Sequence, residues 1–375
     1  MPAPIGAPIQ EYFAAVSDPR VDRTKLHLLM DILVIAICAV ICGADTWVEM
    51  EAYGRAKEPW LRRFLCLPHG IPSHDTFARV LARLKPEELQ QCFLRWMQAV
   101  SKVTQGEVVA IDGKTLRRSF DRATGKGAIH MVSAWASANR LVLGQQKVDE
   151  KSNEITAIPG LLRLLDLKGC IVTIDAMGCQ KAIARTIVEQ EADYVLTLKA
   201  NHGRLYEEVE RFFAEARQRQ FVDVPHQYYH TLEGQHGRIE ERHYWLVSEL
   251  SGFSETQEWL GIQSLGMVER QRTAAGKTPV EVHYYLTSLA GSGQQFGAAV
   301  RTHWSVENGL HWVLDVVFQE DQSRLRRDHA AENFAVLRHL ALSLLRQEST
   351  CANGIKVKRL KAAWDDQYLT RVLLA

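Results

Sequence analysis

The stretch "GEVVAIDGKTLRRS", Gly106–Ser119, places an aspartate directly after a run of apolar residues. The run "EVVAI" has the short, continuous apolar character of a buried strand, and Asp112 is predicted to end it. Three basic side chains, Lys114, Arg117 and Arg118, follow at once. A lone aspartate after a buried strand is usually a turn-former or a helix cap. On this stretch alone, a structural role is therefore the better interpretation of Asp112.

Strand and helix patterns alternate in the residues that follow. After the first strand come two strands that meet at a turn, then a helix, a strand, a helix and a strand, over residues 127–139, 140–150, 154–167, 170–175, 179–191 and 193–199. In such a layer the first strand and the strand after the first helix can lie side by side. Asp175 ends that later strand in "CIVTID", so its carboxylate and that of Asp112 would meet at one edge of the sheet.

Two facing carboxylates suggest a cation site. They repel one another, which raises the pKa of one of them unless a divalent cation neutralises both. Hard oxygen ligands suit magnesium or manganese. A third acid would complete such a site, and Glu307 in "HWSVENGLHW" lies between bulky apolar residues. Asp315, Glu320 and Asp321 follow on the same late segment, and spacing alone does not choose among the four.

The remaining segments differ in composition and in hydrophobic periodicity. A helical pattern rich in Leu, Ala and Arg runs from about residue 9 to residue 102, whereas a polar, aromatic-rich and turn-rich segment follows residue 200. Helical apolar periodicity returns after Gly297 and is followed by a basic tail, "KVKRLKAAW". We expect an α/β protein with four parts: an all-α N-terminal domain, a first core segment, a β-rich insertion and a C-terminal helical part with the tail, over residues 1–102, 103–200, 201–296 and 297–375.

A helix-turn-helix is one interpretation of the N-terminal segment. "EPWLRRFLCL" and "SHDTFARVLARL" flank the breaker "PHGIP", and Ser73 or Asp75 can cap the second helix. Arg79 and Arg83 lie four residues apart on one face of that helix, as DNA-contacting residues would. An ordinary helical hairpin with solvated arginines is the favoured alternative.

Composition excludes few classes of function. The chain has 375 residues and a net charge of +1, so two or three domains are expected and any nucleic acid must be met by local basic patches. The seven cysteines include no pair with zinc-ligand spacing and are typical of reduced core residues. The N-terminus lacks the pattern of a signal peptide. The longest apolar run is interrupted by Asp31, which favours a buried helix over a membrane span.

Five phrases make the chain similar to a known family. They are "AIDGKTLRRS", "TIDAMGCQ", "YVLTLKANH", "GRIEERHYW" and "HWSVENGLHWVLDVVFQEDQSRLRRDHAAENFAVLRHLAL", and they resemble the ISAs-type, H-repeat-associated insertion-sequence transposases over nearly the whole chain. The resemblance implies a DDE transposase with an RNase-H-like core, a mixed sheet with flanking helices. Its catalytic, metal-binding acids fall on Asp112, Asp175 and Glu307, and the β-rich insertion explains the long interval before the glutamate.

The implied chemistry is cleavage of transposon ends followed by strand transfer. Two Mg²⁺ ions, for which Mn²⁺ could substitute, would activate the nucleophile and stabilise the leaving oxygen in an in-line displacement. We expect Asp112 to bridge both ions, with Asp175 and Glu307 each completing one. The freed 3′-OH would then attack the target DNA, and no covalent protein intermediate is needed.

The chain departs from the wider family signature at two positions. His303 stands in "HWSVE" where an arginine is common, and Leu314 stands seven residues after the glutamate, where a lysine is expected. Candidates for the phosphate contact of that lysine are Arg324, Arg326, Arg327 and Lys199.

Several other residues are candidates for contacts with DNA, and most of them have a structural role as the alternative. Lys114, Arg117 and Arg118 follow the first acid and suit a scissile phosphate, although a solvated basic turn is equally plausible. Arg238, in the insertion, is a weaker candidate. Core packing is favoured over base stacking for four tryptophans, which are residues 245, 259, 304 and 312. His303 and His311 are expected to be structural or to face DNA, because imidazole suits zinc better than magnesium.

Two other functions fit the same residues. One is a metal-dependent DNA nuclease that cuts and never joins, and the other is a DNA-binding protein derived from a transposase whose catalysis has been lost. For the transposase we expect double-stranded DNA as partner, both inverted repeats and target, and a homodimer in the synaptic complex. We also expect a cytoplasmic bacterial location, on the nucleoid when bound to DNA.

Overall fold

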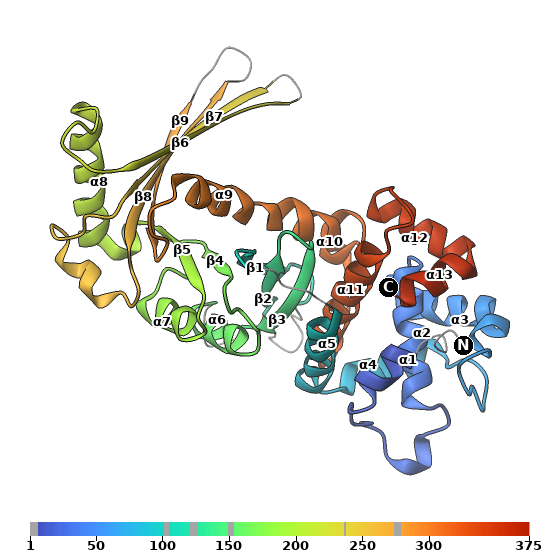
Figure 1. Cartoon of the computed structure of the whole chain (residues 1–375). Coiled ribbons are helices and arrows are strands. Elements are labelled where there is room, and N and C mark those ends of the chain that lie inside the picture. The colour runs from blue at the N-terminus through green and yellow to red at the C-terminus, as the bar shows by residue number, and fades with distance from the viewer. Residues whose placement is uncertain are drawn as a thin grey trace.

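The computed structural model describes residues 7–100, 105–120, 127–148, 154–235, 238–273 and 279–374. These residues form a mixed α/β protein in which one large sheet carries helices on both faces (Figure 1). All helices before residue 105 lie beside the C-terminal helices at one end of the molecule, and a β-ribbon projects at the other end (Figure 1).

The described N-terminal residues form five α-helices, α1 (Ala7–Phe13), α2 (Leu29–Ile41), α3 (Trp47–Leu61), α4 (His74–Arg83) and α5 (Pro86–Val100). Helix α2 is buried from Asp31 to Ile41, as the apolar run predicts. The carboxylate of Asp31 accepts a hydrogen bond of 2.9 Å from the backbone amide of Leu67, which offsets the cost of burying this acid. No helix in the described parts of the chain is long and apolar enough to cross a membrane.

The first half of the sheet follows the predicted order of strands and helices. Its elements are β1 (Val108–Leu116), β2 (Ile129–Ala136), β3 (Leu141–Lys147), α6 (Glu154–Arg163), β4 (Ile171–Ile174), α7 (Lys181–Glu189) and β5 (Asp193–Leu198). Strand β1 pairs antiparallel with β2 and parallel with β4, which confirms that the first strand and the strand after the first helix are neighbours. Asp112 lies within β1 and does not end it, because the pairing with β2 continues to Leu116.

The second half of the sheet comes from the segment expected to be a β-rich insertion, and this segment contains elements that were not predicted. Residues 203–218 form a helix, α8 (Gly203–Gln218), and a strand that the sequence analysis did not predict follows as β6 (Gln227–Gln235). With β7 (Arg238–Val247), β8 (Ser264–Thr273) and β9 (Val280–Thr287), β6 continues the first sheet, because β9 pairs antiparallel with β5. The result is one sheet of order β3-β2-β1-β4-β5-β9-β8-β7-β6.

The C-terminal helices begin on the face of the sheet opposite α6 and α7 and continue beyond the sheet, where the last two pack against each other and the helix before them (Figure 1). They are α9 (Gly293–His303), a π-helical turn (Glu307–His311), α10 (Trp312–Val316), α11 (Ala330–Gln347), α12 (Ile355–Trp364) and α13 (Asp366–Leu373). The segment predicted as a basic tail therefore forms α12. Its Lys358 and Arg359 are buried and donate to backbone carbonyls, among them those of Leu345 and Val40.

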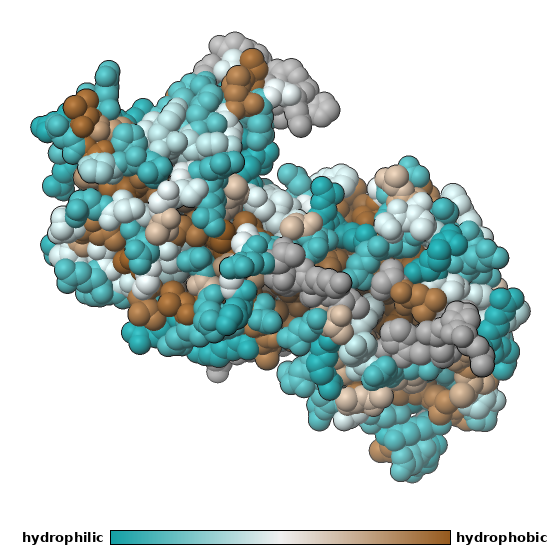
Figure 2. Space-filling view, in the orientation of Figure 1, coloured by the Kyte–Doolittle hydropathy of each residue, from teal (hydrophilic) through white to brown (hydrophobic). Residues whose placement is uncertain are grey.

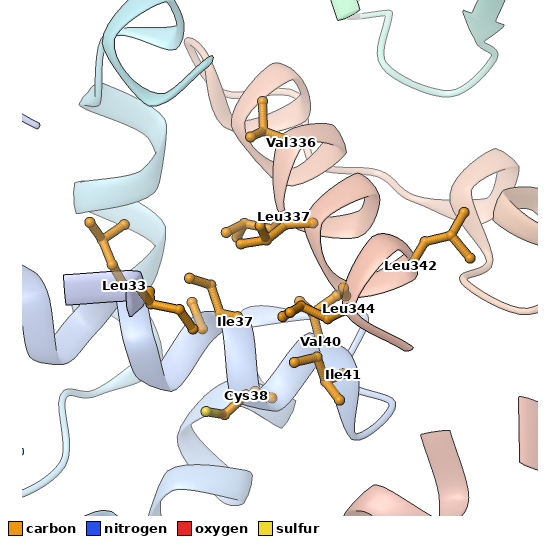
Figure 3. Packing of buried hydrophobic residues seen from close by; sticks show 14 of the residues in the cluster. Leu33, Ile37, Cys38, Val40, Ile41, Val336, Leu337, Leu342 and Leu344 are labelled. Atoms are coloured by element: carbon orange, nitrogen blue, oxygen red, sulfur yellow. The ribbon is translucent and has the colours of Figure 1, made fainter. Parts of the chain in front are cut away.

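The N-terminal and C-terminal helices share one hydrophobic core. Ile37 and Val40 of α2 lie against Leu337 and Leu344 of α11 (Figure 3), and all four side chains are fully buried. Strand residues such as Trp135 belong to the same core. The N-terminal helices are thus held by packing against the far end of the chain. In the space-filling view the outline is hollowed where the ribbon leaves the body (Figure 2).

Candidate active site

A cavity of about 160 Å³ opens between the sheet and the α9–α10 segment. Three of its lining residues are Asp112, Asp175 and Glu307. The structure therefore brings together the three acids that the family resemblance implies. It does not place Asp315 or Glu320 in the lining of this cavity.

Strand register explains the meeting of the two aspartates. Val108 of β1 is level with Ile171 of β4, and the register continues to Ile111 and Ile174. The next pair in this register is Asp112 and Asp175. Because side chains alternate along a strand, Asp112 faces away from the buried Val109 and Ile111 and toward α9 and α10.

Glu307 reaches the cavity through an irregularity in its helix. The α-helical pattern of α9 ends at His303, and Glu307 is the first residue of the π-helical turn. A π-turn replaces i→i+4 bonds by i→i+5 bonds and often occurs at functional sites. Its neighbours Val306 and Leu310 are fully buried, whereas Glu307 itself is exposed into the cavity. The apolar flanks thus fix the backbone while the carboxylate stays accessible.

The negative charges of the three acids repel one another when no cation lies between them. Burial, with the charges of Asp175 and Glu307, raises the pKa of Asp112 to about 7, although the backbone amide of Gly113 donates to its Oδ1. Burial also raises the pKa of Asp175, and Lys199 works against that shift. Such a set of oxygen donors fits a divalent cation, which would offset both repulsion and burial.

Asp175 also has the structural role that an aspartate after a buried strand usually has. Its Oδ1 accepts hydrogen bonds from the backbone amides of Met177 at 3.1 Å and Gly178 at 3.4 Å, as in an Asx turn. These bonds hold the carboxylate at the end of β4 while it lines the cavity. The turn-former and the site residue are the same side chain.

Two histidines support this wall of the cavity. Nδ1 of His303 lies 2.9 Å from Oγ1 of Thr173 on β4, and burial lowers the pKa of His303 to about 4. Nδ1 of His311 lies 3.4 Å from Oδ2 of Asp112, and burial lowers its pKa to about 4 as well. Both imidazoles are therefore neutral near pH 7, and the hydrogen bond between His303 and Thr173 ties the late segment to β4.

Glu154 is a fourth acid near the site that the sequence analysis missed. It begins α6, and its charge contributes to the raised pKa values of both Asp112 and Asp175. Its carboxylate pairs with Nε2 of His130, and a Cβ added at Gly113 would meet this pair at 2.3–2.6 Å. An acid in the first turn of a helix is so common that the sequence offered no distinguishing signal.

The raised pKa of Asp112 predicts a pH-dependent stability. Without metal, the folded state holds this proton more tightly than the unfolded state, in which aspartate titrates near pH 3.9. The resulting stabilisation is full below about pH 4 and is lost as the pH rises through about 7. In chelator, we expect the free energy of unfolding to fall on the order of a few kcal/mol over this range in wild type, and less in Asp112→Asn. Urea unfolding at a series of pH values measures this, and identical pH profiles for the two proteins would contradict it.

Lys114 has a different place from the one predicted. Its Nζ lies 2.5 Å from Asp315, 2.6 Å from Glu320 and 3.7 Å from Asp321, and its side chain is only 11% exposed. Burial works against its charge, but Glu320 and Asp315 outweigh burial and raise the pKa of Lys114. This ammonium is already paired, which does not favour its proposed contact with a phosphate.

The other arginines predicted to contact DNA in the segments after β1 and after α10 either contact an acid or a backbone carbonyl nearby or lie exposed on the surface. Arg117 is 78% exposed, with Nε 3.3 Å from Asp321. Arg326 donates to the backbone carbonyl of Arg118 at 3.0 Å, which joins the segment after β1 to the segment after α10. Arg324 and Arg327 are exposed.

Three predicted arginines lie on other elements. Arg79 and Arg83 are exposed on α4, which packs between α3 and α11. Ser73 precedes that helix, but its hydroxyl makes no capping bond to the backbone. Arg238 begins β7, and its side chain lies outside the described part of the structure. Neither Arg79 nor Arg83 lines the acid cavity.

Lys199 does line the acid cavity, together with Thr197 and His283. It follows β5 directly, is exposed, and faces the same side of the sheet as Asp175, because Leu196 and Leu198 point to the opposite core. Of the basic side chains predicted to contact DNA, Lys199 is the one found in the described lining of the cavity.

Core packing is confirmed for Trp259, and Trp245 is partly buried against the same core, whereas the expectation is wrong for Trp304 and Trp312. Trp259 is buried, whereas Trp304 is 49% exposed and Trp312 is 55% exposed. Trp304 lines both the acid cavity and an adjoining groove of about 620 Å³. Basic residues also line that groove, among them the exposed Arg140 and Lys356.

Known proteins resemble this chain over most of its length. The family profile "Transposase DDE domain" matches residues 104–344, and a profile described as "DDE_Tnp_1-associated" matches residues 10–97. The chain is 42% identical over 370 residues to "Putative transposase YncI" of Escherichia coli O157:H7, covering 97% of this chain and 93% of that relative. It is 41% identical over 372 residues to "H repeat-associated putative transposase YhhI" of Escherichia coli strain K12, covering 97% of each. A solved piggyBac transposase synaptic complex with hairpin DNA covers 98% of this chain and 77% of its own, at TM-score 0.44 and 11% identity.

Proposed function

The chain belongs to the transposase DDE domain family, and we propose that it cleaves transposon ends and joins them to target DNA at the acid cavity. The observation that carries this proposal is the convergence of Asp112, Asp175 and Glu307 from two neighbouring strands and a π-turn on one cavity. We assign β1–β5 and their helices to an RNase-H-like core. Its mixed sheet with helices on both faces supports that assignment.

The three carboxylates hold the metal in this proposal. Bound divalent cations would activate a water or a 3′-OH and stabilise the leaving oxygen. The charges of both Asp175 and Glu307 act on Asp112, and all three acids line one cavity, which suits a bridging role for Asp112. Asp112 would release to solvent, on binding a cation, the proton that its raised pKa retains without one. The amides of Met177 and Gly178 keep Asp175 oriented.

The DNA lies along the cavity and the adjoining groove in this proposal. Lys199 would position the scissile phosphate by charge, without reading sequence. Trp304 would offer its exposed ring to a base beside the cut, since stacking on an aromatic ring tolerates any base. Arg140 and Lys356 would meet backbone phosphates along the groove. A homodimer would hold two such ends in a synaptic complex.

Lys199→Gln is expected to slow end cleavage by about 10–100-fold, because one cation beside the developing charge is lost. End affinity should change less than the rate, since a single phosphate contact contributes little to total binding. Cleavage rates at saturating end DNA measure the effect. Lys168→Gln is the matched control, because Lys168 is an exposed lysine that pairs with Glu191 and does not line the cavity. Equal rates for the two variants would contradict the role of Lys199.

The proposal as a whole is tested with duplexes taken from the DNA that flanks the coding region. In Mg²⁺, the purified chain should nick those ends and join them to a second duplex, and chelator should stop both reactions. Cleavage without joined product would favour the nuclease. Specific binding without metal-dependent turnover would favour the inactive, transposase-derived DNA-binding protein.

A further inference from the structure

A second cluster of metal-ligating side chains lies far from the acids in sequence, on the ribbon of β6 and β7. His230, Glu241 and His243 offer ligand atoms that all lie within 4.8 Å of one another. His230 and His243 are direct cross-strand partners, and Glu241 is two residues before His243 on the same face. None of the three lines the acid cavity.

The cluster has nearly the dimensions of a tetrahedral zinc site. Nε2 of His230 lies 2.9 Å, and Nε2 of His243 lies 3.2 Å, from Oε1 of Glu241. With zinc–ligand distances of about 2.0–2.1 Å, ligand atoms of a tetrahedral site lie about 3.3 Å apart. The imidazole rings are 4.8 Å apart between centroids, so only small side-chain rotations are needed for both nitrogens to face one ion.

A neighbouring tyrosine would orient one of these ligands. The hydroxyl of Tyr228 lies 2.7 Å from Nδ1 of His243. If Nδ1–H donates to this oxygen, Nε2 of His243 is left with a free lone pair pointing at Glu241. Zinc-bound histidines usually have such a partner on their second nitrogen, and that partner affects metal affinity. The ribbon therefore supplies an orienting group as well as three ligands.

We propose that His230, Glu241 and His243 bind one Zn²⁺ ion per chain, separately from the cations of the acid cavity. Two imidazoles and a carboxylate suit zinc, whereas the all-oxygen set of the cavity suits magnesium. The ion joins β6 to β7 across their hydrogen-bonded pair. The side chains of His230 and Glu241 are 37% and 36% exposed, so a fourth position stays open to water or to another oxygen ligand, as in three-ligand zinc sites.

Metal uptake by the full-length chain tests this site. After removal of metal by chelator, wild type should bind one equivalent of Co²⁺, the visible absorption of which reports its ligands, and Zn²⁺ should displace it. His243→Gln should abolish this equivalent. Tyr228→Phe, which keeps the ring and removes only the hydroxyl, should weaken binding by about 10–100-fold.

Two controls separate the site from other ligands. His226→Gln removes a histidine that bonds to the carbonyl of Val224 outside the cluster, and should leave uptake unchanged. Asp112→Asn disables the acid cavity and should also leave it unchanged, so failure here and failure of the transposase proposal are distinguishable. Equal uptake by wild type and His243→Gln, or no uptake by wild type at micromolar ion, would overturn the zinc site and leave the three side chains as surface ion pairs.

Discussion

Asp112→Asn is expected to reduce end cleavage in Mg²⁺ by about 10³-fold or more. Metal assistance supplies several kcal/mol of transition-state stabilisation, and each 1.4 kcal/mol is about a factor of ten in rate. Asparagine keeps the shape of the side chain and can still accept from the amide of Gly113, but it lacks the charge that holds a cation beside Asp175 and Glu307. Single-turnover cleavage of end DNA measures the loss.

End binding should remain within about twofold of wild type, because removing a negative charge does not weaken attraction to phosphates. Asp166→Asn is the matched control, since Asp166 is an exposed aspartate outside the cavity lining. It should cleave like wild type. Cleavage by Asp112→Asn at more than a tenth of the wild-type rate would exclude this aspartate as a metal ligand.

Lys114→Met is expected to lower the free energy of unfolding by about 3–5 kcal/mol, the usual cost of leaving a buried charge without its partner. Methionine keeps the apolar stem but leaves Asp315 and Glu320 facing one another without the ammonium between them. Glu320 is fully buried, with Arg338 3.8 Å away as a second cation. Urea unfolding of the two proteins measures the difference.

Arg117→Met provides the comparison for Lys114→Met. Arg117 comes from the same basic run and contacts Asp321, but it is 78% exposed, so its loss should cost less than about 1 kcal/mol. The structural role of Lys114 fails if Lys114→Met is as stable as Arg117→Met and instead loses affinity for DNA ends.

The pairing that builds the site was predictable from local pattern. Two apolar runs, each followed by aspartate, and a helix between them were enough to predict that β1 and β4 are neighbours. The choice of Glu307 over Asp315 and Glu320 needed the family resemblance. Only the structure explains that choice in physical terms, since a π-turn directs Glu307 to the cavity while Asp315 and Glu320 turn to Lys114.

Other features could not be predicted because they depend on distant contacts. The alternation along β1 puts Lys114 on the same face as Asp112, but the acids that pair with it lie some 200 residues later in sequence. Helix α8, by contrast, carries a local signal, because Leu205, Val209 and Phe213 recur every four residues on its buried face within an otherwise polar segment. The basic composition around Lys358 and Arg359 predicts a solvated tail, because their carbonyl partners on other helices cannot be found from the local sequence.

The most direct test of whether the three acids bind a divalent cation is an anomalous difference map from crystals of this protein soaked in Mn²⁺. We expect a peak in the cavity between β1, β4 and the π-turn, with carboxylate oxygens of Asp112, Asp175 and Glu307 about 2.0–2.2 Å from the ions. A cavity without a peak, in crystals that bind Mn²⁺ elsewhere, would contradict it.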